Sequence, residues 1–165
     1  MKTMLEKPEQ MPDNATDRPL VTFALFAYNQ EEYIREAVEG AFAQTYEPLE
    51  IILSDDCSTD RTFKIMQEMA DAYDGPHCII LRRNIINLGT ALHVQMAFGE
   101  SRGLLFVVAA GDDISRPNRV SILVDTWTGA GHPEGAIHSG YESFRKGQII
   151  ALQPAKRYGF SDRIL

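Results

Sequence analysis

Four mainly apolar runs of strand length alternate along this chain with segments of helical periodicity. The runs cover residues 20–27, 49–54, 77–83 and 103–111. A run of this length without regular polar alternation indicates a strand that is buried on both faces, as in a parallel sheet. The alternation with helices predicts an α/β fold in which a mostly parallel sheet is flanked by helices and joined by right-handed crossovers.

The segments between these runs predict four helices, over residues 30–46, 58–73, 90–101 and 118–130. In the first helix, apolar residues recur at spacings of three and four, which places them on one face. Asn29 is its expected N-cap, and Ser58 or Thr59 is the expected N-cap of the second. Each helix therefore has an apolar side that can cover the sheet.

The chain divides into three parts. Residues 1–18 are polar, contain two prolines and lack periodicity, which predicts a flexible leader. Residues 19–150 form one domain, and within residues 135–154 we expect a strand and a hairpin that turns at Lys146-Gly147. Residues 151–165 are a tail without an assignment.

Composition narrows the class of protein. The 165 residues are enough for one domain with a sizeable core, and the formal net charge of −7 argues against nucleic-acid binding through a basic face. Two cysteines are too few for a disulfide framework and have no zinc-site spacing. No stretch approaches 18 apolar residues. We therefore expect a cytoplasmic protein with free thiols.

Acidic pairs follow two of the predicted strands. Asp55 and Asp56 end the second strand, Asp112 and Asp113 end the fourth, and Tyr28 follows the first. Ligands of parallel α/β sheets bind at these carboxyl ends. Adjacent carboxylates repel unless a cation or hydrogen-bond donors compensate, and Mg²⁺ or Mn²⁺ prefers such oxygen ligands. The alternative is that each pair only caps the helix after it.

An ordered set of motifs carries a family resemblance. The stretch "VTFALFAYNQEEYIREAVEGAFAQTYEPLEIILSDDCSTDRT" is followed by "NLG" at residues 87–89 and by "GDD" at residues 111–113. Together they resemble the opening of family 2 glycosyltransferases of the GT-A fold, from residue 20 to residue 127 and more weakly to residue 150. The resemblance implies a nucleotide-diphosphate-sugar donor, UDP-linked in most members, and a Mn²⁺ or Mg²⁺ cofactor.

The resemblance also implies roles for single residues. Tyr28 would stack on or border the nucleobase, and Asp56 would accept a hydrogen bond from the base. Asp112 would hold the ribose or assist the metal, and Asp113 would coordinate the cation at the diphosphate. Alternatively, Asp55 braces its own loop, and the Tyr28 ring packs under the first helix.

The sequence departs from the family pattern at several positions. Ala110 stands where many members have the first aspartate of the metal motif, and Cys57 replaces a common glycine. Arg82 and Arg83 lie near a strand end, where they either reach the diphosphate or are solvated. His93 is expected to be structural.

The family's catalytic base is an acidic residue on a helix well after the metal motif, and it takes the proton of the acceptor hydroxyl in an inverting attack. This chain has 52 residues after Asp113, without a convincing candidate. We therefore expect the donor-binding half of a longer enzyme, truncated at its C-terminus, with a glycan or lipid-linked acceptor.

Two further expectations concern this donor-binding half of the enzyme. The alternative function is a non-catalytic module that binds a nucleotide sugar and lacks the base. An incomplete domain would expose apolar surface, which predicts self-association into a homo-oligomer. A nucleotidyltransferase is disfavoured because "FAYNQEEY", at residues 26–33, contains no glycine-rich phosphate loop.

Overall fold

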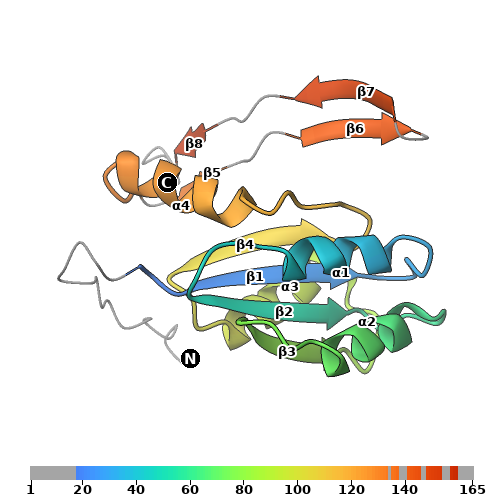
Figure 1. Cartoon of the computed structure of the whole chain (residues 1–165). Coiled ribbons are helices and arrows are strands. Elements are labelled where there is room, and N and C mark those ends of the chain that lie inside the picture. The colour runs from blue at the N-terminus through green and yellow to red at the C-terminus, as the bar shows by residue number, and fades with distance from the viewer. Residues whose placement is uncertain (1–17, 134, 138–140, 146–147, 154–156, 160–165) are drawn as a thin grey trace, which may run out of the picture.

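A computed structural model describes residues 18–133, 135–137, 141–145, 148–153 and 157–159. The predicted leader, except for its last residue, lies outside this part. The main body is a four-stranded sheet packed between helices (Figure 1). Its strands are β1 (Val21–Ala27), β2 (Leu49–Asp55), β3 (Cys78–Arg83) and β4 (Leu105–Ala110).

All neighbouring strands of this sheet are parallel, in the order β3-β2-β1-β4. Ala27 of β1 lies opposite Asp55 of β2, and Phe26 lies opposite Ala110 of β4. The three strand ends singled out by their polar residues therefore meet at one edge of the sheet. The prediction of a mostly parallel α/β sheet is confirmed.

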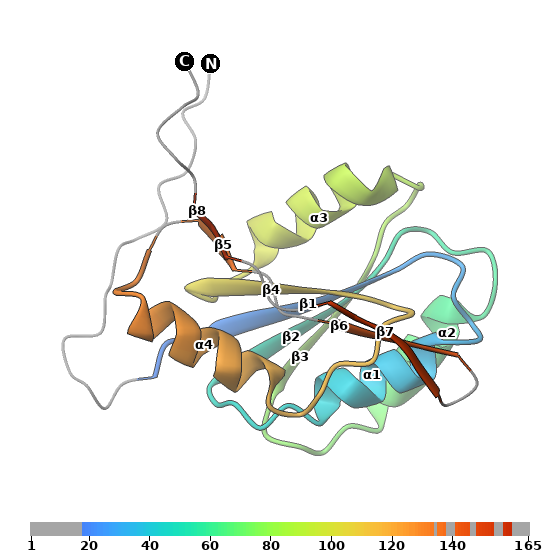
Figure 2. The same ribbon diagram turned by 90° about the horizontal axis from the view of Figure 1, so that it is seen from above.

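Four helices cover the two faces of the sheet. They are α1 (Ile34–Phe42), α2 (Thr62–Asp71), α3 (Gly89–Glu100) and α4 (Arg119–Gly129). Helices α1, α2 and α4 lie on one face and α3 lies alone on the other (Figure 2). The crossovers thus place helices on both faces, as a parallel sheet requires.

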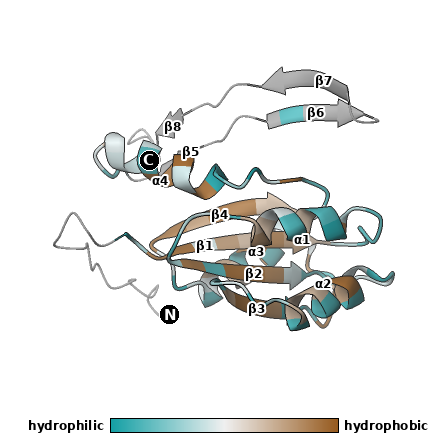
Figure 3. Cartoon of the chain, in the orientation of Figure 1, coloured by the Kyte–Doolittle hydropathy of each residue, from teal (hydrophilic) through white to brown (hydrophobic). Residues whose placement is uncertain are grey.

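The core follows the alternation of side chains along the strands. Phe23 and Leu25 of β1 and Ile51 of β2 pack with α1, α2 and α4 in the larger cluster. Ala24 of β1 and Ile52 of β2 point the other way and pack with α3. Because both faces of β1 and β2 are buried, these strands are apolar along most of their length (Figure 3).

Short antiparallel strands follow α4. Strand β5 (Gly135–Ile137) pairs with β8 (Arg157–Gly159), and β6 (Tyr141–Arg145) pairs with β7 (Gln148–Gln153). The β6–β7 pair is the hairpin that the sequence predicts, although its turn lies outside the described residues. Strand β8 falls in the tail that the sequence left without an assignment.

The predicted N-caps are wrong. Helix α1 begins at Ile34 after Tyr33, and α2 begins at Thr62 after Arg61; neither preceding residue makes a side-chain capping bond. Asn29 lies outside its helix in the left-handed conformation, with φ at 51°. Asn29, Ser58 and Thr59 instead form hydrogen bonds that join the loop after β1 to the loop after β2.

Candidate functional site

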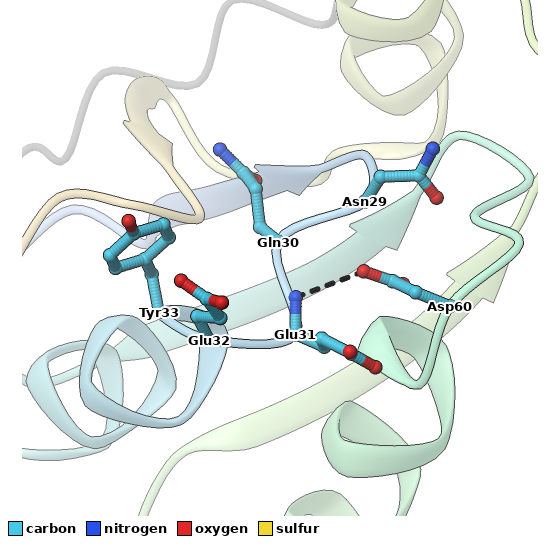
Figure 4. A pocket seen from close by; sticks show the side chains of 6 residues that line it. All are labelled: Asn29, Gln30, Glu31, Glu32, Tyr33 and Asp60. Carbon is cyan, nitrogen blue, oxygen red and sulfur yellow. Dashed lines mark hydrogen bonds between the residues drawn. The ribbon is translucent and has the colours of Figure 1, made fainter.

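The β1–α1 loop and the β2–α2 loop are joined by hydrogen bonds between polar side chains and backbone amides. Asn29 donates its backbone N–H to Ser58 Oγ at 2.9 Å, and its own Oδ1 accepts from the Thr59 N–H at 2.8 Å. The Glu31 N–H donates to Asp60 Oδ2 at 3.1 Å (Figure 4). This connection holds the carboxyl ends of β1 and β2 in one arrangement.

A shallow acidic hollow of about 240 Å³ lies over these loops (Figure 4). It is lined by Asn29, Gln30, Glu31, Glu32, Tyr33 and Asp60. Three of these side chains are carboxylates, so the hollow favours cations or hydrogen-bond donors over anions.

Asp55 is a bracing residue. Its side chain is fully buried, and Oδ2 accepts from the Ser58 N–H at 2.9 Å and lies 3.2 Å from Arg83 Nε. Arg83 also donates to the Ser58 carbonyl at 2.6 Å and stacks over Phe63. The bracing alternative for Asp55 is confirmed. The Arg83 side chain is 43% exposed, so it stays partly solvated while it braces the same loop.

Asp56 lies beneath the loop between β3 and α3 and is only 3% exposed. Its Oδ1 accepts from Asn84 Nδ2 at 2.7 Å and from the Leu88 N–H at 2.9 Å, and its Oδ2 accepts from the Gly89 N–H at 2.9 Å. Burial by itself would raise the pKa of Asp56, but these hydrogen bonds outweigh it and hold the pKa below its ordinary value. The carboxylate is therefore ionised at neutral pH.

Asp112 and Asp113 are both exposed at the end of β4. The pKa of Asp113 is raised, mainly by partial burial and to a smaller extent by the charge of Asp112, while the charge of Arg119 lowers it. The turn that carries them packs closely on β1, because a Cβ on Gly111 would lie 2.5 Å from Gln30 Oε1 and 2.9 Å from Ala27 Cβ. The two acids are thus held next to the end of β1.

The carboxylates of Asp112 and Asp113 fit a site in which the protein supplies only one or two ligands to a divalent cation. In the described part of the chain, no group of three or more His, Cys, Asp or Glu side chains is placed to hold a metal ion. Mg²⁺ sites of phosphate-transferring enzymes use one or two carboxylates and take their other ligands from phosphate oxygens and water. Asp112 and Asp113 supply carboxylates of that number, next to each other at the end of β4.

Tyr28 directly follows β1, whose last residue, Ala27, lies opposite Asp55. It is 46% exposed, so its ring is not packed under α1. An exposed ring at this edge is able to stack on a planar base.

Arg82 and His93 form part of a buried network that the sequence did not reveal. Arg82 NH1 donates to Ser54 Oγ at 2.6 Å, and Ser54 Oγ lies 2.6 Å from His93 Nε2. The Arg82 side chain is 11% exposed and pairs with Glu100, so the solvated alternative is wrong for this residue.

Comparisons with known proteins identify the family of this chain. The family model for Glycosyl transferase family 2 matches residues 22–155. The chain therefore belongs to glycosyl transferase family 2. Its sheet and flanking helices have the GT-A fold, as the sequence predicted.

Among curated relatives, an uncharacterized glycosyltransferase of Rickettsia prowazekii is 28% identical over 142 residues, which is 85% of this chain and 42% of that protein. The succinoglycan biosynthesis protein ExoO of Rhizobium meliloti is 33% identical over 113 residues, covering 68% of this chain and 31% of that protein. The chain spans less than half the length of each of these relatives.

Two solved structures show the same fold. A mannosyltransferase of Pyrobaculum calidifontis, in complex with GDP-Man and Mn²⁺, has a TM-score of 0.55 and 26% identity, covering 59% of this chain and 28% of that one. Residues 1–349 of S. aureus TarS, in complex with UDP-GlcNAc, have a TM-score of 0.62 and 18% identity, covering 79% of this chain and 36% of that one.

No helix in the part of the chain that the structure describes is long and apolar enough to cross a membrane.

Proposed function

We propose that this chain binds a nucleotide-diphosphate sugar, UDP-linked, and supplies the donor half of a metal-assisted, inverting sugar transfer to a glycan or lipid-linked acceptor. The observation that carries the proposal is the convergence of Tyr28, Asp56 and the Asp112-Asp113 pair at one edge of the parallel sheet. Such an edge is where α/β proteins bind nucleotides.

The nucleoside would lie along the ends of β1 and β2. The exposed ring of Tyr28 stacks on or borders the base, and the Asp56 carboxylate accepts a hydrogen bond from a base N–H. A carboxylate offers about four lone-pair positions, of which three are already filled in Asp56. One position on Oδ2 is left, which matches a base that presents a single ring N–H there.

The sugar diphosphate would lie at the end of β4. Asp112 holds the ribose or assists the metal, and Asp113 coordinates Mn²⁺ or Mg²⁺ together with diphosphate oxygens. When bound, the cation neutralises the negative charge that builds on the leaving diphosphate. The P. calidifontis mannosyltransferase, which was solved with GDP-Man and Mn²⁺, supports a divalent ion in this fold.

Transfer itself joins the acceptor oxygen to the anomeric carbon as the bond from that carbon to the diphosphate oxygen breaks. The leaving nucleoside diphosphate keeps the electron pair, and a general base takes the proton of the acceptor hydroxyl. Of the acidic residues after Asp113, Glu142 forms an ion pair with Arg116 at 2.8 Å. We assign none of the chain's acids as this base.

We further propose a cytoplasmic location and self-association of this chain. Self-association is supported by apolar side chains on α3 and β4 that are about half exposed, namely Leu92, Met96 and Val108.

Calorimetric titration of the purified chain with UDP tests the proposal, with Mn²⁺ and then with EDTA. We expect binding that requires the metal and that Asp113→Asn abolishes. Asp125→Asn is the matched control, because Asp125 is exposed on α4 and plays no part in the proposed site. Absence of binding under every condition would refute the donor site.

Turnover separates the two candidate functions. Release of UDP from a UDP-sugar, added with a mixture of glycan acceptors, would support an active transferase. Metal-dependent binding without turnover would support the module that binds a nucleotide sugar and lacks the base.

A further inference from the structure

A continuous set of side-chain hydrogen bonds runs from helix α3 to the Asp56 carboxylate. It passes through His93, Ser54, Arg82 and Asn84, with the distances 2.6 Å, 2.6 Å, 2.9 Å and 2.7 Å in that order, ending at Asp56 Oδ1. His93, Ser54, Asn84 and Asp56 are buried. Buried polar groups of this kind are held in place because each would lose a hydrogen bond by turning away.

The chemistry of each group sets the direction of these bonds. The Arg82 guanidinium only donates, so Ser54 Oγ and Asn84 Oδ1 both act as acceptors toward it. With its Oδ1 turned to Arg82, Asn84 has its amide nitrogen facing Asp56. The Arg82 cation therefore determines which end of the Asn84 amide meets the carboxylate.

The Ser54 hydroxyl orients His93. Because Ser54 Oγ accepts from Arg82, its single proton is free to be donated to His93 Nε2. Burial lowers the pKa of His93, and so does the charge of Arg82, although Asp56 and Asp55 oppose these effects. The imidazole is thus neutral and serves as a fixed acceptor that ties α3 to the end of β2.

The network acts on the one carboxylate that the donor site uses for the base. Asn84 and the Leu88 N–H occupy Oδ1, so the remaining lone pair lies on Oδ2 beside Gly89. The backbone of Asn84 is also fixed, because its N–H donates to the Asp55 carbonyl at 2.8 Å. Rotation of Asp56 would break bonds to three separate donors.

We propose that Arg82 and Asn84 are positioning residues of the donor site, which together with Ser54 and His93 orient the Asp56 carboxylate so that one lone pair of Oδ2 faces the base. This inference rests on the proposed function. It differs from both alternatives that the sequence left for Arg82, diphosphate contact and solvation, since the arginine acts here through Asn84 and touches no donor atom.

The test compares Asn84→Ala with Asn87→Ala in the full chain. Both asparagines lie in the same loop, but Asn87 donates nothing to Asp56. Its Oδ1 accepts, at 3.0 Å, from the same Gly89 N–H that donates to Asp56 Oδ2 at 2.9 Å. With UDP and Mn²⁺ as the probe, we expect the Kd to rise about tenfold for Asn84→Ala, which is the effect of one hydrogen bond to a charged group. We expect a change of less than about twofold for Asn87→Ala.

A second readout needs no nucleotide. The amide NMR shifts of Leu88 and Gly89 report the protonation of the carboxylate to which they donate. We expect the pKa of Asp56 to rise in Asn84→Ala, which loses a donor to Asp56. It should not rise in Asn87→Ala, which leaves the Gly89 N–H to Asp56 alone. If Asn84→Ala does not fold, Asn84→Asp keeps the size of the side chain and should raise both the Kd and the pKa of Asp56 further.

The outcomes are distinguishable. If wild-type protein binds UDP and Asn84→Ala binds it equally well, with an unchanged pKa of Asp56, the positioning role is overturned. An equal loss of binding in both asparagine variants would also overturn it, because loop order alone would then explain the effect. If wild-type protein does not bind UDP at all, the proposed function fails, and the donor role of the network fails with it.

Discussion

Cys57 occupies a backbone conformation that suits glycine. Its φ is 63°, in the left-handed region, and it lies between Asp56 and Ser58 in the loop that borders the proposed donor site. An L-residue pays roughly 1–2 kcal/mol for this conformation, whereas glycine adopts it freely. Glycine in turn loses about 0.5–1 kcal/mol more backbone entropy on folding. The difference predicts that Cys57→Gly stabilises the fold by about 0.5–1 kcal/mol.

Little else should change in this variant. The thiol makes one long contact, 3.4 Å from Sγ to the Ile85 carbonyl, and a thiol is a weak donor. For a chain of this size, the expected gain corresponds to a rise in Tm of about 1–4 °C. Urea denaturation followed by circular dichroism measures the free energy of unfolding directly.

Two controls isolate the backbone effect. Cys57→Ala removes the thiol but keeps a Cβ at positive φ, so its stability should stay close to that of wild type. Asn29→Gly also changes a residue at positive φ, but it should destabilise, because the Asn29 side chain accepts from the Thr59 N–H. An equal gain from Cys57→Ala, or a loss from Cys57→Gly, would refute the reasoning.

Two further predictions concern packing and pH. Gly111→Ala should lower the free energy of unfolding by about 1–3 kcal/mol, because its Cβ has no room beside Ala27. Gly99→Ala, on open helix surface, should instead stabilise the fold by up to about 1 kcal/mol. Equal effects of the two variants in urea denaturation would contradict this. Burial by itself would raise the pKa of Glu50, but hydrogen bonds from Arg102 and Thr22 outweigh burial and lower the pKa overall. The stability that Glu50 contributes to the fold is therefore present above the ordinary carboxyl pKa. It is lost as the pH falls through the lowered value. Unfolding free energies from about pH 7 to about pH 3 should fall less steeply in Glu50→Gln than in wild type, and parallel curves would contradict the assignment.

The fold was largely accessible from the sequence because its signals are local and strong. Strands β1 and β2 are buried on both faces, which makes them nearly continuous apolar runs that differ visibly from the amphipathic helices between them. The expected parallel sheet follows from that alternation and is present. The order of the strands in the sheet, β3-β2-β1-β4, cannot be predicted from the apolar runs alone.

The helix starts were harder to predict because capping residues have competing partners. Asn29 and Ser58 are common N-cap types, but their polar groups bond to each other's loops across some 30 positions of sequence. A local rule has no access to such a partner. The same limit explains why Asp55 and Asp56, adjacent in sequence, have different surroundings: the first braces its own loop and the second lies under the loop between β3 and α3.

The sequence by itself determined the family, the layered α/β architecture and the positions of the acidic strand ends, because these depend on residue type and spacing along the chain. Only the tertiary structure decided what each polar side chain contacts. The sequence left Arg82 either at the diphosphate or solvated and made His93 structural; the structure places both in a buried network with Asn84 and Asp56. The physical reason is that hydrogen-bond partners are chosen by proximity in space, which parallel strand pairing and the packing of α3 create.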